Sequence, residues 1–170
     1  MTRTGAVGLA LFLASLPLGH ADDRFRFPIA SLVEDTARGL VWERCSLGQV
    51  FHEGRCRGEA ARLTLAEAEA RLGAMATAEC PWRLPRFFEL RGLVQAGDGN
   101  TAIEGEAFPD TPAGWYWTQV SAGGHSQQDC FVDFAGRGRT RCNMAGRFHV
   151  RPVMSLESAA PVCLSPGPGS

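Results

Sequence analysis

Lysine is missing from this chain of 170 residues, in which all 17 basic residues are arginine. We attribute that choice to a GC-rich coding sequence and draw no function from it. The formal net charge is only −1, which argues against a nucleic-acid-binding protein or another general polyanion binder. The motifs G-x-S-x-G and H-E-x-x-H and the phosphate-binding loop are also missing, so the sequence predicts no catalytic residue, no metal and no cofactor.

Long apolar runs are missing after residue 21, so we expect no membrane span in the mature chain. Residues 1–21 contain Arg3, an apolar run over residues 6–14, and the small residues Gly19 and Ala21 where a signal peptidase would cut. This layout is typical of a secretory signal peptide, and an uncleaved N-terminal anchor is the alternative. We therefore expect a periplasmic or secreted protein.

Six cysteines in a secreted chain indicate disulfides, and the missing C-x-x-C leaves little support for thioredoxin-like exchange or a zinc knuckle. We expect the pairs Cys45–Cys56, Cys80–Cys163 and Cys130–Cys142. The third pair follows from a hairpin predicted around Gly136, which places its two cysteines directly opposite each other. The first pair brackets a loop that contains Gly48 and Gly54, and the second pair remains by elimination.

The expected fold is α+β, with two helices packed on short antiparallel strands, long loops and disulfides. Strands are predicted over residues 32–35, 39–43, 115–120, 130–134, 139–144 and 148–154. Thr64 and Glu67 form a capping box that begins the first helix, and Leu65, Ala68, Leu72 and Met75 make its buried face. Pro85 is predicted to begin a second helix that ends at residues 97–100. A single domain is expected over residues 22–164, with a disordered tail over residues 165–170.

A motif that joins aromatic residues, arginine and proline follows Cys80. It consists of Trp82, Arg83, Leu84 and Pro85, with Glu89 and Leu90 shortly after. Together with Gly39-Leu40-Val41-Trp42, Tyr116-Trp117-Thr118 and Val132-Asp133-Phe134, its order over residues 30–154 resembles the Lcl C-terminal domain family of bacterial envelope proteins.

That resemblance implies a C-type-lectin-like fold related to the formylglycine-generating enzymes, and one named member of the family is an adhesin that binds sulfated glycans. The chain departs from the family pattern at its last predicted strand. Where members often read Val-Arg-Cys-Val-Arg, it has residues 150–154, Val-Arg-Pro-Val-Met. The tripeptides through which C-type lectins hold calcium and sugar are also missing.

Three tryptophans and one leucine of these motifs are interpreted mainly as core residues, because buried aromatic side chains dominate core energetics. Trp82, Leu84, Trp115 and Trp117 are the residues concerned. The alternative is an aromatic residue that stacks on a sugar ring. If Trp115 and Trp117 face the core, strand alternation turns Tyr116 outward and makes it the candidate for such contacts.

An arginine cluster is the best candidate for binding. Five arginines fall between Phe134 and Leu156, a stretch without any acidic residue. Arg139 is expected to pair with Asp133 across the hairpin, which leaves four candidate ligand-binding residues, namely Arg137, Arg141, Arg147 and Arg151. Arginine suits planar sulfate and carboxylate groups, so an anionic polysaccharide is the expected ligand.

Two functional hypotheses from different classes follow. The leading one is a non-catalytic recognition module that binds an anionic glycan or an envelope protein. The alternative is an oxidase of the formylglycine-generating kind, which would require a reactive pair of thiols. A purely structural envelope protein also remains open.

Overall fold

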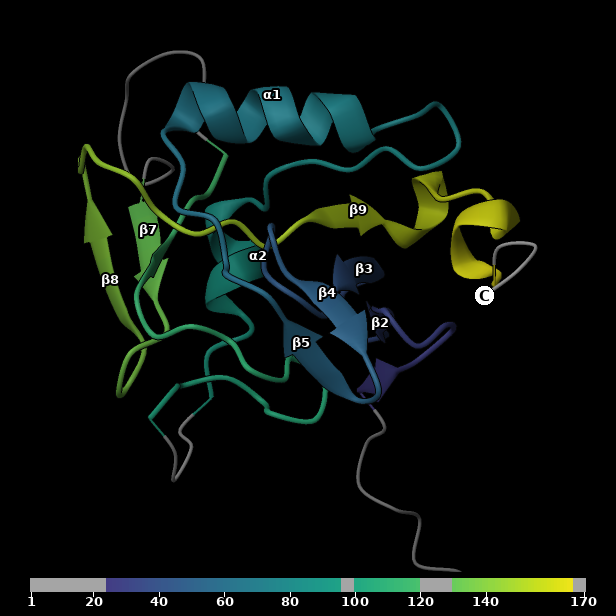
Figure 1. The fold of residues 1–170 in the computed structure, drawn as a ribbon, viewed down its shortest axis with the longest axis horizontal. Coiled ribbons are helices and arrows are strands. Elements are labelled where there is room, and N and C mark those ends of the chain that lie inside the picture. The colour runs from purple at the N-terminus through teal and green to yellow at the C-terminus, as the bar shows by residue number, and fades with distance from the viewer. Residues whose placement is uncertain (1–23, 96–99, 120–129, 167–170) are drawn as a thin grey trace, which may run out of the picture.

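The computed structural model describes residues 24–95, 100–119 and 130–166. The predicted signal peptide and residues 167–170 of the predicted tail lie outside the described residues. Figure 1 shows one three-stranded sheet at one end of the molecule, a four-stranded sheet toward the other end, and the longer helix lying along one side. No helix in the described part of the chain is both long enough and apolar enough to cross a membrane.

The four-stranded sheet has the order β1-β2-β3-β9, and every pairing in it is antiparallel. Its strands are β1 (Phe25–Arg26), β2 (Leu32–Asp35), β3 (Leu40–Glu43) and β9 (Val153–Ser155). Gly39 has a φ of 62° in the turn between β2 and β3, a conformation that glycine adopts without strain. The pairing of β3 with β9 brings the two ends of the domain together.

The three-stranded sheet has the order β6-β7-β8 and is antiparallel throughout. It consists of β6 (Trp115–Tyr116), β7 (Cys130–Asp133) and β8 (Arg139–Cys142). Gly138 in the turn from β7 to β8 has a φ of 70°, and a Cβ there would lie 2.2 Å from Cγ1 of Val94. The turn therefore requires glycine at this position for both its backbone conformation and its packing.

Two α-helices, α1 (Leu65–Met75) and α2 (Phe87–Arg91), complete the main elements. The predicted capping box of α1 is present, and Ala68 and Leu72 are buried on its inner face. The second helix is shorter than expected: it begins after Arg86 and ends at Gly92, so the prediction of a helix from Pro85 to residues 97–100 is wrong. Val94 has already left the helix, because it forms a β-bridge with Ile103.

Three disulfides join the pairs expected from the sequence, namely Cys45–Cys56, Cys80–Cys163 and Cys130–Cys142. The first closes the loop that carries the hairpin β4 (Val50–His52) and β5 (Arg55–Arg57). The second ties the motif segment to the short 3-10 helix at Pro161–Leu164, which follows another at Leu156–Ser158. The third crosses β7 and β8, as the predicted register requires.

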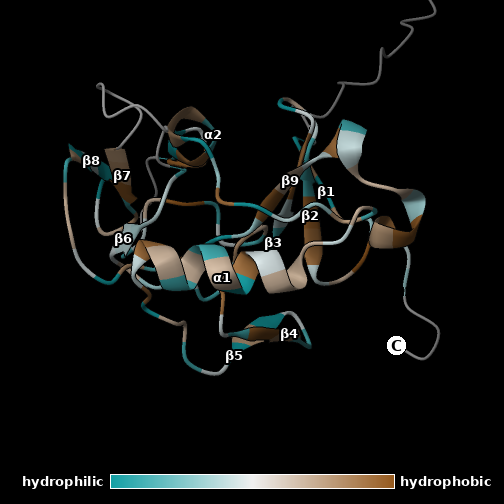
Figure 2. Cartoon of the chain, turned by 90° about the horizontal axis from the view of Figure 1, so that it is seen from above, coloured by the Kyte–Doolittle hydropathy of each residue, from teal (hydrophilic) through white to brown (hydrophobic). Residues whose placement is uncertain are grey.

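The core is divided into three clusters, and the apolar residues gather between the sheets and helices (Figure 2). The first cluster lies between the two sheets and α2, and contains Trp42, Leu90 and Val132. The second lies under α1 and contains Leu72, Trp117 and Phe131. The third covers the other face of the four-stranded sheet, where Val41, Met154 and the half-buried Trp82 meet.

The last predicted strand, over residues 148–154, is partly wrong. Strand β9 begins only at Val153, while Phe148 and His149 form isolated bridges to Leu63 and Tyr116. Pro152 has no N–H to donate to a ladder, and its carbonyl accepts from the Glu43 N–H at 3.1 Å. The chain therefore crosses from the second cluster to the four-stranded sheet over these residues instead of running as one strand.

Candidate ligand-binding surface

The hairpin formed by β7 and β8 presents an arginine at alternate positions along its exposed strand. Every residue of β8 is exposed, while every residue of β7 is buried. Phe131 lies opposite Arg141 and Asp133 lies opposite Arg139. Arg137 is exposed in the turn between the strands. Alternate residues on a strand are about 7 Å apart, so Arg139 and Arg141 form a spaced row.

Arg139 is held by the only acidic residue of the hairpin that the structure describes. Its Nη2 lies 2.6 Å from Oδ2 of Asp133, and the other carboxylate oxygen accepts the Ala135 N–H at 2.8 Å. The carboxylate is buried, yet 71% of the Arg139 side chain remains exposed. The guanidinium also lies 5.9 Å from the ring of Trp115. Arg139 therefore has a fixed orientation and a largely open outer edge.

Arg137 and Arg141 form no ion pair or hydrogen bond with any residue that the structure describes. Both side chains are exposed. Exposed guanidinium groups without a protein partner retain all five N–H donors for solvent or a ligand. These two residues are therefore the freest cations of the predicted cluster.

Arg147 lies beside the first turn of α1 and forms an ion pair and a hydrogen bond there. Its Nη2 is 2.9 Å from Oε2 of Glu67, and its Nε donates to the carbonyl of Arg62 at 3.1 Å. Arg62 returns the contact by donating to the carbonyl of Arg147 at 3.3 Å. Half of the Arg147 side chain is still exposed (53%), so it can contribute charge to the surface without being free.

A groove of about 430 Å³ separates α1 from the end of the hairpin. Its walls are Leu65, Trp117, Phe131, Met144 and the backbone around Gly146. Arg141 pairs with Phe131 across the hairpin, so it lies on the same face of the sheet as this wall of the groove, although it does not line the groove itself. The surface therefore combines exposed cations with an adjacent apolar depression.

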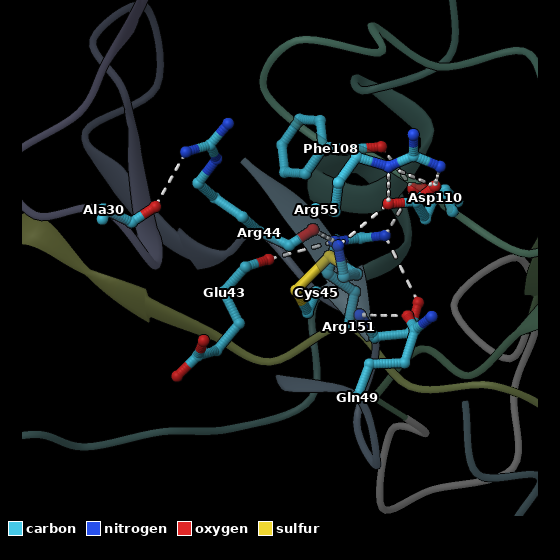
Figure 3. Close-up of a disulfide and its surroundings, with 12 residues drawn as sticks. Ala30, Glu43, Arg44, Cys45, Gln49, Arg55, Phe108, Asp110 and Arg151 are labelled. Carbon is cyan, nitrogen blue, oxygen red and sulfur yellow. Dashed lines mark hydrogen bonds and ion pairs between the residues drawn. A yellow bond between two sulfur atoms is a disulfide. The ribbon is translucent and has the colours of Figure 1, made fainter. Parts of the chain in front are cut away.

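Arg151 does not belong to the exposed cluster, and this prediction from the sequence is wrong. The residue is fully buried beneath Cys45, where its guanidinium donates to the carbonyls of Glu43 and Arg44 (Figure 3). A further N–H donates to Oγ1 of Thr111 at 2.7 Å, while Nε has no partner among the described residues.

Arg151 forms no ion pair with any carboxylate that the structure describes, and the side chain of Glu43 points away from it (Figure 3). The guanidinium is instead 4.8 Å from the ring centre of Phe108. Burial lowers the pKa of Arg151, and the nearby Tyr116 and Glu43 oppose that shift. The side chain donates hydrogen bonds to four acceptors, which are backbone carbonyls and side-chain hydroxyls. It thereby stabilises the segment around Cys45.

Tyr116 is fully buried, so the expectation that it faces outward is also wrong. Its hydroxyl lies 2.8 Å from Oγ of Ser46, and its ring packs on Phe134 with centroids 5.0 Å apart. Strand alternation does separate Tyr116 from Trp117, but it sends them into two different clusters. Tyr116 therefore faces the first cluster and Trp117 the second, and only the half-buried Trp115 of residues 115–117 reaches solvent.

The motif after Cys80 is held by an ion pair between Arg83 and Glu89. Nη1 of Arg83 lies 2.8 Å from one carboxylate oxygen and Nη2 lies 2.9 Å from the other. The same carboxylate accepts the Arg86 N–H at 2.7 Å at the start of α2. Leu84 and Pro85 are buried, as is Trp42, while Trp82 is only half-buried. The motif is thus mainly structural, with one aromatic edge left at the surface.

A second, smaller pocket of about 200 Å³ lies at that aromatic edge. It is lined by Trp82, Arg83 and Leu84 on one side, by the α1 residues Glu69, Leu72 and Gly73 on the other, and by Gln119. This pocket was not predicted from the sequence. Gly73, in the last turn of α1, is the signal that could have pointed to it, because glycine is less favourable in a helix than alanine.

The described residues contain no group of three or more His, Cys, Asp or Glu side chains that could hold a metal ion. His52 and Glu53 approach to 3.7 Å, but both are largely exposed on the β4–β5 turn. Cys130 and Cys142, the pair that an oxidase would need as thiols, are bonded to each other. Among the carboxylates, burial raises the pKa of Glu43 to about 7, opposed by the charge of Arg151.

Of three comparisons with known proteins, the comparison with family models gives a match. No curated protein and no solved structure matches the chain. A family model described as the Lcl C-terminal domain matches residues 31–154, which include both α-helices, the three-stranded sheet with its arginine-rich hairpin, and the four-stranded sheet apart from β1 and the last residue of β9. The chain therefore belongs to the Lcl C-terminal domain family.

Proposed function

We propose that the protein is a secreted or periplasmic recognition module that binds an anionic glycan through the surface of the β7–β8 hairpin. The observation that carries the proposal is the row of cations on one exposed strand. Arg137 and Arg141 have no partner among the described residues, and Arg139 keeps most of its side chain exposed despite its ion pair. Arg147 adds charge at the border of this surface.

The charge distribution favours a polyanion over a single small anion. Arginines at alternate positions of a strand, whose Cα atoms are about 7 Å apart, can contact successive charged groups along an extended chain. Sulfate and carboxylate groups accept two parallel N–H bonds from one guanidinium, which favours sulfated or carboxylated sugars. The adjacent groove beside Phe131 offers an apolar surface for the rest of a sugar ring.

We further propose that the fold is of the C-type lectin kind, as the family resemblance implies. Two α-helices, short antiparallel strands, long loops and disulfides near both ends of the domain support this assignment. The proposed binding surface uses arginine rather than calcium, so binding should persist when calcium is removed.

A glycan array on the mature domain tests the proposed function. We expect binding to sulfated or carboxylated polysaccharides, equal with calcium and with a chelator, and weaker as salt rises from low to physiological concentration, where the Debye length shrinks to about 8 Å. Binding confined to neutral glycans, or binding that requires calcium, would contradict the proposal. If the domain binds an envelope protein and no glycan, that protein and not a glycan is the ligand of this surface.

A further inference from the structure

The pocket between α1 and Trp82 has a composition opposite in charge to the arginine-rich hairpin. Its lining residues include the acidic Glu69 and the aromatic Trp82, together with the apolar Leu72 and Leu84. The one cation in the lining, Arg83, is matched by two contacts of 2.8 and 2.9 Å to Glu89. Glu69 forms no ion pair with any described residue, so the lining carries one uncompensated negative charge.

Gly73 supplies a second, independent observation. It lies in the last turn of α1, which ends at Met75, and glycine is less favourable than alanine in a helix because it leaves the unfolded backbone freer. A Cβ at Gly73 would meet no atom within 4 Å, so packing does not require glycine there. The residue instead leaves open space in the lining of the pocket to which Trp82 also belongs.

We propose that this pocket binds the cationic side chain, lysine or arginine, of a partner protein. Such a side chain has an apolar stem that fits the walls formed by Leu72 and Leu84, and a charged end that is attracted both by a carboxylate and by the face of an indole. A volume of about 200 Å³ accommodates one side chain and is too small for an oligosaccharide. The pocket is separate from the glycan surface and does not depend on it.

The test uses small probes that differ only in charge. We expect Nα-acetyl-lysine amide and Nα-acetyl-arginine amide to shift the indole N–H resonance of Trp82 in NMR spectra, assigned by its loss in Trp82→Phe. Their neutral counterparts, Nε-acetyl-lysine and citrulline derivatives, should bind about tenfold more weakly, because they lose both the cation–π contact and the ion pair.

Variants of α1 separate binding from stability. Glu69→Gln should weaken binding of both cationic probes about fivefold, while Glu59→Gln, at another exposed carboxylate, should not change it. Gly73→Leu should raise the melting temperature and abolish binding, because it favours the helix and fills the pocket. Ala74→Leu, at an exposed position of the same helix outside the pocket, is the matched control.

Four outcomes would overturn the proposal. Equal affinity for charged and neutral probes would show that charge is not recognised. A shift caused by glucose but not by the cations would make the pocket a neutral-sugar site. Unchanged binding in Gly73→Leu would place the probes elsewhere, and no shift with any probe at millimolar concentration would show that the pocket binds none of these ligands.

Discussion

Arg83 and Glu89 form a bidentate ion pair that joins the motif after Cys80 to the first turn of α2, with N–O distances of 2.8 and 2.9 Å. Burial acts to raise the pKa of Glu89, but hydrogen bonds from Arg83 and from the Arg86 N–H hold it below its usual value. One carboxylate therefore fixes the orientation of the arginine and caps the N-terminus of the helix.

Glu89→Gln should lower the free energy of unfolding by about 1–3 kcal/mol, since hydrogen bonds to charged groups contribute about that much. Urea unfolding at pH 7 measures the effect, with Glu59→Gln as a control that leaves the midpoint unchanged. Because the folded pKa of Glu89 is depressed, its contribution is present above pH 4.5 and is lost as pH falls through the folded pKa. A variant as stable as the wild type would show that the pair is not structural.

Arg151→Ala should destabilise the domain strongly, by about 3 kcal/mol or more, because it leaves several buried acceptors without donors. Arg151→Lys should rescue little, since one ammonium group cannot reproduce the planar fork that reaches two carbonyls and two hydroxyls. Differential scanning calorimetry and urea unfolding measure both effects. Arg141→Ala is the control at an exposed position, and a wild-type melting temperature in Arg151→Ala would contradict the internal role.

The stability of the protein should fall as pH rises between 4.5 and about 7, because folded Glu43 keeps its proton over this window while the unfolded chain loses it. His149 acts in the opposite direction: burial lowers its pKa, so its contribution is lost as pH falls. Comparison with Glu43→Gln isolates the first effect. The variant should lack this decline and be more stable than the wild type at pH 8; parallel pH profiles would contradict it.

The disulfides should differ in their contribution to stability. Cys80 and Cys163 are 83 residues apart, whereas Cys45 and Cys56 are 11 apart. Loop-closure entropy predicts losses of about 4.5 and about 3 kcal/mol when each pair is replaced by alanine. Guanidinium unfolding of the two double variants measures this order, and non-reducing peptide mapping checks the pairing. Equal losses would show that the length of the closed loop does not set the contribution of each disulfide.

Local patterns predicted much of the fold, because they express rules that act over a few residues. The capping box at Thr64 fixed the beginning of α1, and alternation around Gly136 fixed the register of β7 with β8. The α+β class and the family followed from the order of such elements. Pro85 misled the prediction of α2, because the helix begins two residues later, where Glu89 accepts the Arg86 N–H.

The binding surface was predicted less completely, because exposure depends on packing between distant segments. Arg151 and Arg141 look alike in the sequence, yet one is fully buried among residues from three other segments and the other lies on an exposed strand. Tyr116 is buried because two core clusters enclose its strand, which alternation alone cannot reveal. The pocket at Trp82 joins residues from α1 and the motif after Cys80, which are not adjacent in the sequence.

The central claim is that the cations of the β7–β8 hairpin bind an anionic glycan. The most direct measurement is the retention of the mature domain on a sulfated-polysaccharide column, compared between Arg137→Ser/Arg141→Ser and the charge-matched control Arg57→Ser/Arg91→Ser, whose arginines are also exposed. We predict that the wild type and the control elute at similar salt, and that the hairpin variant elutes at clearly lower salt with an unchanged melting temperature. Equal elution of the two variants, or a wild type that flows through at low salt, would contradict the claim.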